Sequence, residues 1–296
     1  MNKYRIGILA VLALCFAVAL GKLWAASAQA PPTAEFLAAA LQSQEAACGD
    51  SLEVNYTIAP ETTKVPSGYA DPKTTIGHPI TRVHYVRTPD RQFAEEVASE
   101  DGKELYSKKQ TYDRATGQSR TLESNPEKSN GYGLIAMGRG LIGRPELLDP
   151  ILICSFQQPL QELCAIGSVS SEMELIDGHS CYKINIAPGQ GDTESRSIWL
   201  DPSVGFCPRR IAVLRADGSP RYTTTFFDYK TTDGVWFPWR MEIVCTDVDG
   251  SIWNTVHCQA IDLSLGKAFS KDSLAVTFPS GTEVVDRVLN LEYTVP

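Results

Sequence analysis

The chain has 296 residues, a formal net charge of −8 at pH 7, and apolar side chains at 43% of its positions. An acidic chain without a basic stripe argues against nucleic acid as a partner. The apolar content is sufficient for one large core, so a single domain fits the length better than two domains.

The first 28 residues have the pattern of a secretory signal peptide. Lys3 and Arg5 precede an almost wholly apolar run, Ile6–Leu20, and the small residues Ala26-Ser27-Ala28 follow it. A retained membrane anchor and a lipoprotein signal at Cys15 are the alternatives, and the anchor is disfavoured because the apolar run is short for a bilayer. We expect cleavage after Ala28, which leaves residues 29–296 as one exported, periplasmic domain.

Seven cysteines remain after this cleavage, and export permits disulfides. No two of them have the spacing of a zinc ribbon or of a redox pair, and their pairing does not follow from the sequence. The alternative is that most are small buried apolar side chains. They are Cys48, Cys154, Cys164, Cys181, Cys207, Cys245 and Cys258.

The N-terminal half predicts one helix followed by polar strands. Thr33 can cap a helix over Ala34–Ala47, where Phe36, Leu37, Ala40 and Leu41 share a face. A strand over Asp50–Ile58 and a loop over Pro60–Pro79 come next. A meander with one wet face follows; its strands are Thr81–Arg87, Arg91–Ser99, Lys103–Asp113 and Gly117–Glu123.

The middle of the chain interrupts this strand pattern. Residues 124–150 are first polar and then rich in glycine, which indicates a loop insertion. Ile151–Cys164 has apolar residues at helical spacing broken by Pro159, so it predicts one helix or two short ones.

The C-terminal half is nearly all strands, joined by turns such as Asp177-Gly178 and Asp233-Gly234. Val284–Leu291 adds a candidate last strand. A sheet of about ten strands tends to curl. We therefore expect a mainly β (α+β) fold: a strongly curved antiparallel sheet, an incomplete half-barrel, with the helices on its concave side.

One of these strands supplies the candidate ligand cavity. Its alternating residues form one wholly apolar face, which in a half-barrel points at the helices. Large aromatic side chains with a methionine make an adaptable apolar wall. The alternative is that they only pack against Phe36, Leu37 and Leu152 and bind nothing. The five residues are Val235, Phe237, Trp239, Met241 and Ile243.

Two short motifs resemble binding loops by their letters alone. Gly138–Gly143 matches a dinucleotide loop, but Arg144-Pro145 follows it and the surroundings are antiparallel. Asp247–Ser251 begins like a calcium loop, but Cys258 stands where the last glutamate is required. We expect no cofactor, no metal and no catalysis.

Six short motifs recur through the second half of the chain. They are Asp177-Gly178-His179-Ser180-Cys181-Tyr182, Ser197-Ile198-Trp199-Leu200-Asp201-Pro202, Gly205-Phe206-Cys207-Pro208-Arg209-Arg210, Phe227-Asp228-Tyr229-Lys230, Asp233-Gly234-Val235-Trp236-Phe237-Pro238 and Phe278-Pro279-Ser280-Gly281-Thr282-Glu283-Val284-Val285-Asp286. With these motifs the chain resembles the lipoprotein-carrier superfamily, which includes LolA, LolB and RseB. The resemblance covers residues 165–295 well and residues 33–125 loosely.

The resemblance implies a half-barrel with a hydrophobic cavity between sheet and helices. The function it implies is an exported, non-catalytic binding protein for a lipid, an acyl chain or a lipidated protein, in transient contact with a membrane surface. One alternative is a sensory or interaction module of the RseB type. The other is a hydrolase, which would need Ser, His and carboxylate side chains in one cleft.

Overall fold

The computed structural model describes residues 31–62, 79–127, 130–138, 149–150, 159–189 and 193–296. All helices and strands discussed below belong to one compact unit, Thr33–Pro296. The expected signal peptide, Leu152, Cys154 and residues 139–143 of the glycine motif lie outside the described residues.

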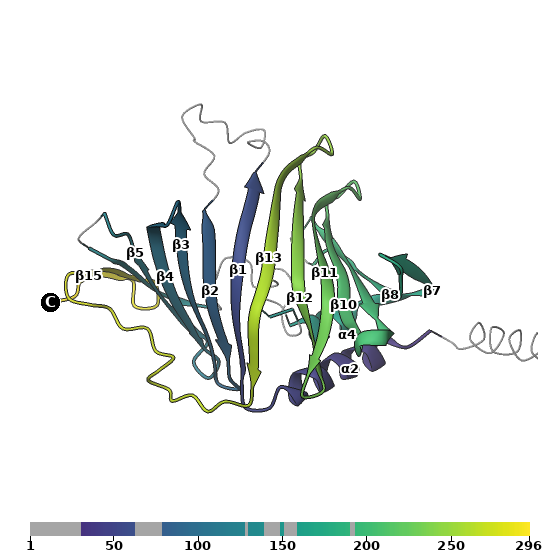
Figure 1. The fold of residues 1–296 in the computed structure, drawn as a ribbon, viewed down its shortest axis with the longest axis horizontal. Coiled ribbons are helices and arrows are strands. Elements are labelled where there is room, and N and C mark those ends of the chain that lie inside the picture. The colour runs from purple at the N-terminus through teal and green to yellow at the C-terminus, as the bar shows by residue number, and fades with distance from the viewer. Residues whose placement is uncertain (1–30, 63–78, 128–129, 139–148, 151–158, 190–192) are drawn as a thin grey trace, which may run out of the picture. The chain divides into compact units, whose positions relative to one another are not determined.

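The described chain forms a single fifteen-stranded sheet with two α-helices, α2 (Ala34–Ala47) and α4 (Leu160–Ile166), and a short 3-10 helix, η2 (Pro202–Val204) (Figure 1). The strands in the first half are β1 (Leu52–Thr62), β2 (Ile80–Arg87), β3 (Arg91–Glu100), β4 (Lys103–Asp113), β5 (Gln118–Ser124) and β6 (Tyr132–Met137). In the second half they are β7 (Ser168–Ile176), β8 (His179–Ile186), β9 (Ser195–Asp201), β10 (Cys207–Leu214), β11 (Pro220–Thr232), β12 (Val235–Thr246), β13 (Ile252–Leu265), β14 (Glu283–Asp286) and β15 (Leu291–Thr294).

The order across the sheet is β15-β14-β6-β5-β4-β3-β2-β1-β13-β12-β11-β10-β9-β8-β7. Neighbours are antiparallel except β6 and β14, which run parallel. The sheet is curved and open, so the expected incomplete half-barrel is confirmed. β1 and β13 join its two halves, since they pair along the whole length of β1.

Tight turns produce much of this antiparallel order. In Asp101-Gly102, Asp177-Gly178 and Asp233-Gly234 both residues have positive φ. That conformation belongs to the two-residue hairpin turn, whose twist matches the twist of the flanking strands. The sequence therefore specifies these three hairpins locally.

Helix α2 begins as predicted, because the Thr33 Oγ1 accepts a hydrogen bond from the Phe36 backbone N–H at 3.2 Å. Leu37 and Leu41 are its buried residues. The prediction that Phe36 shares this buried face is wrong: its side chain is 53% exposed. Phe36 precedes Leu37 by one residue, which places its side chain about 100° around the helix from that of Leu37. Its ring packs edge to face on Phe206, with 5.5 Å between the ring centroids.

Two strand predictions differ from the structure. Tyr132–Met137, within the region predicted as a loop insertion, forms strand β6 between β5 and β14. The single strand predicted over Val284–Leu291 is instead the pair β14 and β15, with Asp286 accepting hydrogen bonds from the Val288 and Leu289 backbone N–H groups in the turn. This carboxylate cap ends β14.

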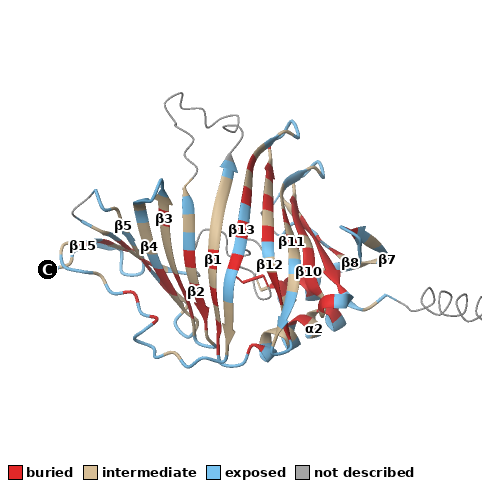
Figure 2. Cartoon of the chain, in the orientation of Figure 1, coloured by how far each residue is buried: buried red, intermediate tan, exposed pale blue. Residues whose placement is uncertain are grey.

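The two faces of the sheet bury different clusters, and buried residues lie on strands in both halves of the sheet (Figure 2). We call the face that carries Leu52 and Val54 the inner face, because these residues pack with the helices in the main core. On the outer face, Val86 and Phe93 pack under Leu274 and Val276, which belong to the segment after β13. The C-terminal segment therefore covers part of the outer face, which the sequence pattern predicts to be exposed to solvent.

All six described cysteines are buried. Burial raises the pKa of the Cys181 thiol to about 12. Among the described residues, no helix is long and apolar enough to cross a membrane.

Candidate ligand-binding face

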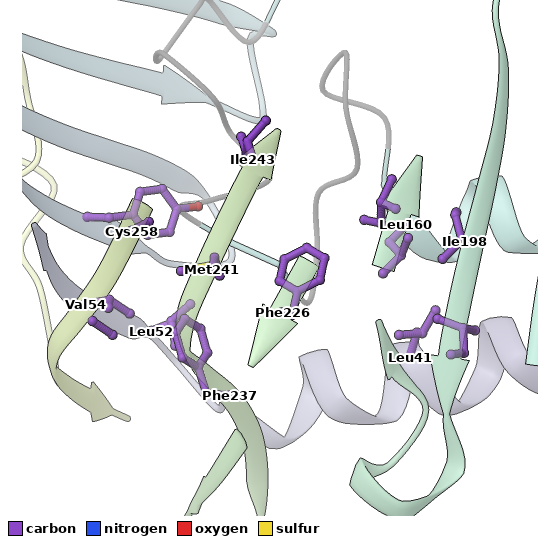
Figure 3. Close-up of a cluster of buried hydrophobic side chains, with 14 of the residues drawn as sticks. Leu41, Leu52, Val54, Leu160, Ile198, Phe226, Phe237, Met241, Ile243 and Cys258 are labelled. Atoms are coloured by element: carbon purple, nitrogen blue, oxygen red, sulfur yellow. The ribbon is translucent and has the colours of Figure 1, made fainter. Parts of the chain in front are cut away.

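The predicted cavity wall on β12 lies in the centre of the main core (Figure 3). Val235, Phe237, Met241 and Ile243 are completely buried, and Trp239 packs against the same core with part of its ring exposed. Register joins these residues to the neighbouring strands, with Met241 opposite Phe226 on β11 and Cys258 on β13. The structure thus brings the five predicted residues together on one surface.

Helices α2 and α4 cover this surface. Leu37 and Leu41 of α2 and Leu160 and Leu163 of α4 belong to the same buried cluster as the β12 residues. Gln44 of α2 also accepts a hydrogen bond from the Trp236 backbone N–H at 3.2 Å. We call this region the apolar sector: the inner face of β8–β13 and β1 beneath the two helices.

Among the described residues, two buried polar groups in or beside the apolar sector have no hydrogen-bond partner. The Thr224 Oγ1 is buried in a row of branched aliphatic residues, with Ile211 and Ile243 directly opposite it. The Trp239 Nε1 is also buried and unpaired, while the Lys230 Nζ lies 4.0 Å from the centroid of its ring. Each such group forgoes about 1–3 kcal/mol of hydration.

The inner face changes character on the other side of β1. Cross-strand partners share one face of a sheet, so register defines two inner rows that cross β2–β5. We call these rows the polar sector. The first row contains Arg87, Gln92, Tyr112 and Ser119, and the second contains Tyr85, Ala94, Gln110 and Thr121.

An ion pair anchors the polar sector to the chain segment at Asp149. The Arg87 Nε donates to the Asp149 Oδ2 at 2.6 Å, and the Tyr85 hydroxyl donates to the same oxygen at 3.0 Å. Glu45 of α2 lies 3.7 Å from Arg87 and 3.9 Å from Arg114. Burial lowers the pKa of Arg87, but Asp149, Tyr85, Cys48 and Glu45 together raise it above its usual value.

Several donors in the polar sector remain unpaired. Arg87, Gln92 and Gln110 are each at least 95% buried. The Arg87 Nη2, the Gln92 Nε2 and both amide atoms of Gln110 have no hydrogen-bond partner among the described residues. Buried polar groups in proteins are paired almost without exception, so these atoms are unusual for a buried position.

The sequence does not predict the polar sector. Gln92 and Gln110 fall on the inner face of their strands, but a polar residue at every second position is typical of the solvent-exposed face of a meander. Only register shows that this face adjoins the main core: Arg87 lies opposite Leu52, and Tyr85 lies opposite Val54.

A third inner row, farther along strands β3–β5, contains charged residues. Lys108 and Glu123 form an ion pair at 3.2 Å. Glu96 lies directly opposite Lys108. Burial raises the pKa of Glu96; Lys108 opposes this rise and Glu123 adds to it. Acidic groups therefore equal or outnumber cations along the polar sector and this row.

Ser, His and carboxylate side chains also meet on the outer face, where the resemblance motifs converge. The Asp201 carboxylate accepts hydrogen bonds from Arg209 at 2.7 Å and from the Ser203 hydroxyl at 2.6 Å, and it lies 3.4 Å from His179. A hydrolytic triad places the histidine between serine and carboxylate. Here the carboxylate occupies the middle position, and the Ser203 hydroxyl donates its hydrogen bond to Asp201 rather than to His179.

Within the described part of the chain, no group of three or more His, Cys, Asp or Glu residues could hold a metal ion. The calcium-like stretch at Asp247 is a hairpin turn, in which the Asp249 side chain accepts hydrogen bonds from the Ser251 backbone N–H and hydroxyl at 2.9 and 2.5 Å. These contacts are those of an ordinary Asx turn.

No protein-family profile and no curated protein sequence matches this chain. Several solved structures, however, are similar to it in fold. One is a structure described as an outer membrane lipoprotein-sorting protein domain from Vibrio parahaemolyticus. It is 11% identical to this chain in sequence, and the match covers 80% of this chain and 95% of that chain with a TM-score of 0.50. A DUF1329 family protein from Desulfovibrio piger is 11% identical, with 81% and 98% covered and a TM-score of 0.54.

A LolA superfamily protein from Nitrosomonas europaea is also similar, at 13% sequence identity. The match covers 79% of this chain and 99% of that chain, with a TM-score of 0.46. Identities this low speak for the fold alone. The chain therefore shares the fold of the lipoprotein-sorting domain and of the DUF1329 protein, which agrees with the fold that the sequence resemblance implies.

Proposed function

We propose that this protein is an exported, non-catalytic binding protein that carries an acyl-type ligand between its curved sheet and its helices. The observation that carries the proposal is the divided inner face. An apolar sector under α2 and α4 adjoins a polar sector whose buried donors lack partners. Such a surface matches a ligand that has an apolar chain and a polar group.

The β12 residues would form the chain-binding wall. Because Val235, Phe237, Met241 and Ile243 are completely buried, a chain reaches them only if the helices move away from the sheet. Trp239 is the accessible position of the wall, since its side chain is only partly buried in the main core. The carboxylate-centred arrangement of Ser203, Asp201 and His179 further favours binding over hydrolysis.

Binding of a fluorescent fatty-acyl probe tests this proposal. Trp239→Ala should weaken probe binding about tenfold, because the contact of a partly buried aromatic ring is worth about 1.4 kcal/mol. Trp199→Ala is the matched control: this indole lies in the small outer-face cluster with Ile176 and Cys181 and donates to Glu174 at 2.7 Å. Circular dichroism confirms that both variants fold.

Equal binding by wild type and the folded Trp239→Ala variant would remove β12 from the binding wall. Absence of probe binding by the wild type would contradict the proposed function.

A further inference from the structure

We infer that the polar sector binds a neutral carbonyl group, the ester or amide carbonyl of an acyl ligand, through Arg87, Gln92 and Gln110. This inference rests on the proposed function and names the polar part of its ligand. It is supported by the unpaired atoms, by the strand register that places them close together, by the charges around them and by the neighbouring apolar surface.

The unpaired atoms are mostly donors. The Arg87 Nη2 and the amide nitrogens of Gln92 and Gln110 offer N–H groups, and the Gln110 Oε1 is the one unpaired acceptor among these three residues. An oxygen acceptor satisfies the donors. An amide ligand would also offer an N–H to the Gln110 Oε1.

Register brings the three side chains to one place. Arg87 on β2 lies directly opposite Gln92 on β3, and Gln110 on β4 is diagonal to Gln92, since Gln92 pairs with Tyr112. Directly opposite residues have Cβ atoms about 5 Å apart and diagonal ones about 7–8 Å. Long amide and guanidinium side chains reach a common group across those distances.

The charges favour a neutral ligand over an anion. The Arg87 guanidinium is paired with Asp149, and Glu45 stands between Arg87 and Arg114. In the next row one cation, Lys108, is paired with Glu123 and also lies directly opposite Glu96. A carboxylate or phosphate would enter beside four acidic side chains and three cations that they already neutralise.

The neighbouring surface positions an acyl chain. Arg87 lies opposite Leu52, and Tyr85 lies opposite Val54, at the border between the two sectors. Leu52 and Val54 belong to the main core with Phe237. A carbonyl bound at Arg87 would therefore send its chain across β1 toward β12.

Competition against the fluorescent fatty-acyl probe tests the inference with four ligands of equal chain length: methyl dodecanoate, N-methyldodecanamide, dodecanoate and dodecane. The ester and the amide should compete about tenfold better than dodecane and dodecanoate, the effect of one or two hydrogen bonds. The double variant Gln92→Met, Gln110→Met should lose this preference and still bind dodecane. Gln118→Met, a strand residue on the outer face, should keep it.

Tightest binding by dodecanoate would overturn the inference and leave the proposed function standing, as would a preference that survives in the double variant. Failure of all four ligands to bind would contradict both. A second readout needs no ligand. Replacing unpaired buried amides by apolar side chains of similar length should leave thermal stability equal or higher, and a clear loss relative to Gln118→Met would show that the amides are paired.

Discussion

At the scale of single residues, Asp201 shows how the resemblance motifs act structurally. Its carboxylate is almost completely buried and binds Arg209, Ser203 and the Ser203 backbone N–H. Burial alone would raise the pKa of Asp201, but the hydrogen bonds from Ser203 and Arg209 lower it overall. The motif residues Asp201 and Arg209 therefore hold the end of β9 to the start of β10.

Asp201→Asn should destabilise the protein by about 3 kcal/mol at neutral pH, because it leaves the Arg209 guanidinium buried without its charge partner. A carboxyl whose pKa is lower in the folded state contributes stability above its unfolded pKa, about 3.9, and loses it as the pH falls through the folded value. The difference between variant and wild type in urea denaturation should therefore shrink in acid.

Asp217→Asn is the matched control for this prediction. Asp217 accepts the same two hydrogen bonds, from the Ser219 backbone N–H and hydroxyl, but it is exposed. It should change stability little at any pH. A difference for Asp201→Asn that persists unchanged at low pH would contradict the assigned role of its charge.

At the scale of elements, packing at Gly167 joins helix α4 to the sheet. A Cβ at this position would stand 2.3 Å from the Ile184 Cγ2 and 3.3 Å from the Ile186 Cγ1. The backbone itself is unstrained, with φ at −79°. The close approach of helix end and strand β8 therefore depends on the absence of a side chain.

Gly167→Ala should cost about 1–3 kcal/mol, since an added methyl group in a packed site forces neighbours to shift. Gly189→Ala is the control, because a Cβ there meets nothing within 4 Å. Chemical denaturation of the two variants measures the difference. Equal stability would mean that α4 does not pack on β8 as closely as described.

The elements also show what sequence predicts well. Asp-Gly turns and alternating residues locate strands of the C-terminal half, and Thr33 locates the start of α2, because these signals act within a few residues. The parallel pairing of β6 with β14 depends on contacts between residues more than a hundred positions apart. No local pattern carries that information, so a strand at Tyr132–Met137 was not predicted.

At the scale of the whole molecule, the sheet divides its inner face at β1. The sequence predicted the apolar sector, since the β12 stripe is unambiguous. It did not predict the polar sector, because whether Gln92 and Gln110 face water or the interior depends on what covers β3 and β4. The outer-face packing of Leu274 and Val276 on Val86 and Phe93 shows the same dependence, since residues far along the chain supply the cover.

The central claim is that the protein carries an acyl-type ligand. Native mass spectrometry of the protein purified from the cell envelope tests this claim most directly. The account predicts that part of the protein carries an additional mass, which dissociates on collision as a species containing an ester- or amide-linked acyl chain. Wild-type protein that shows only its own mass, and that gains none after incubation with methyl dodecanoate, would contradict the account.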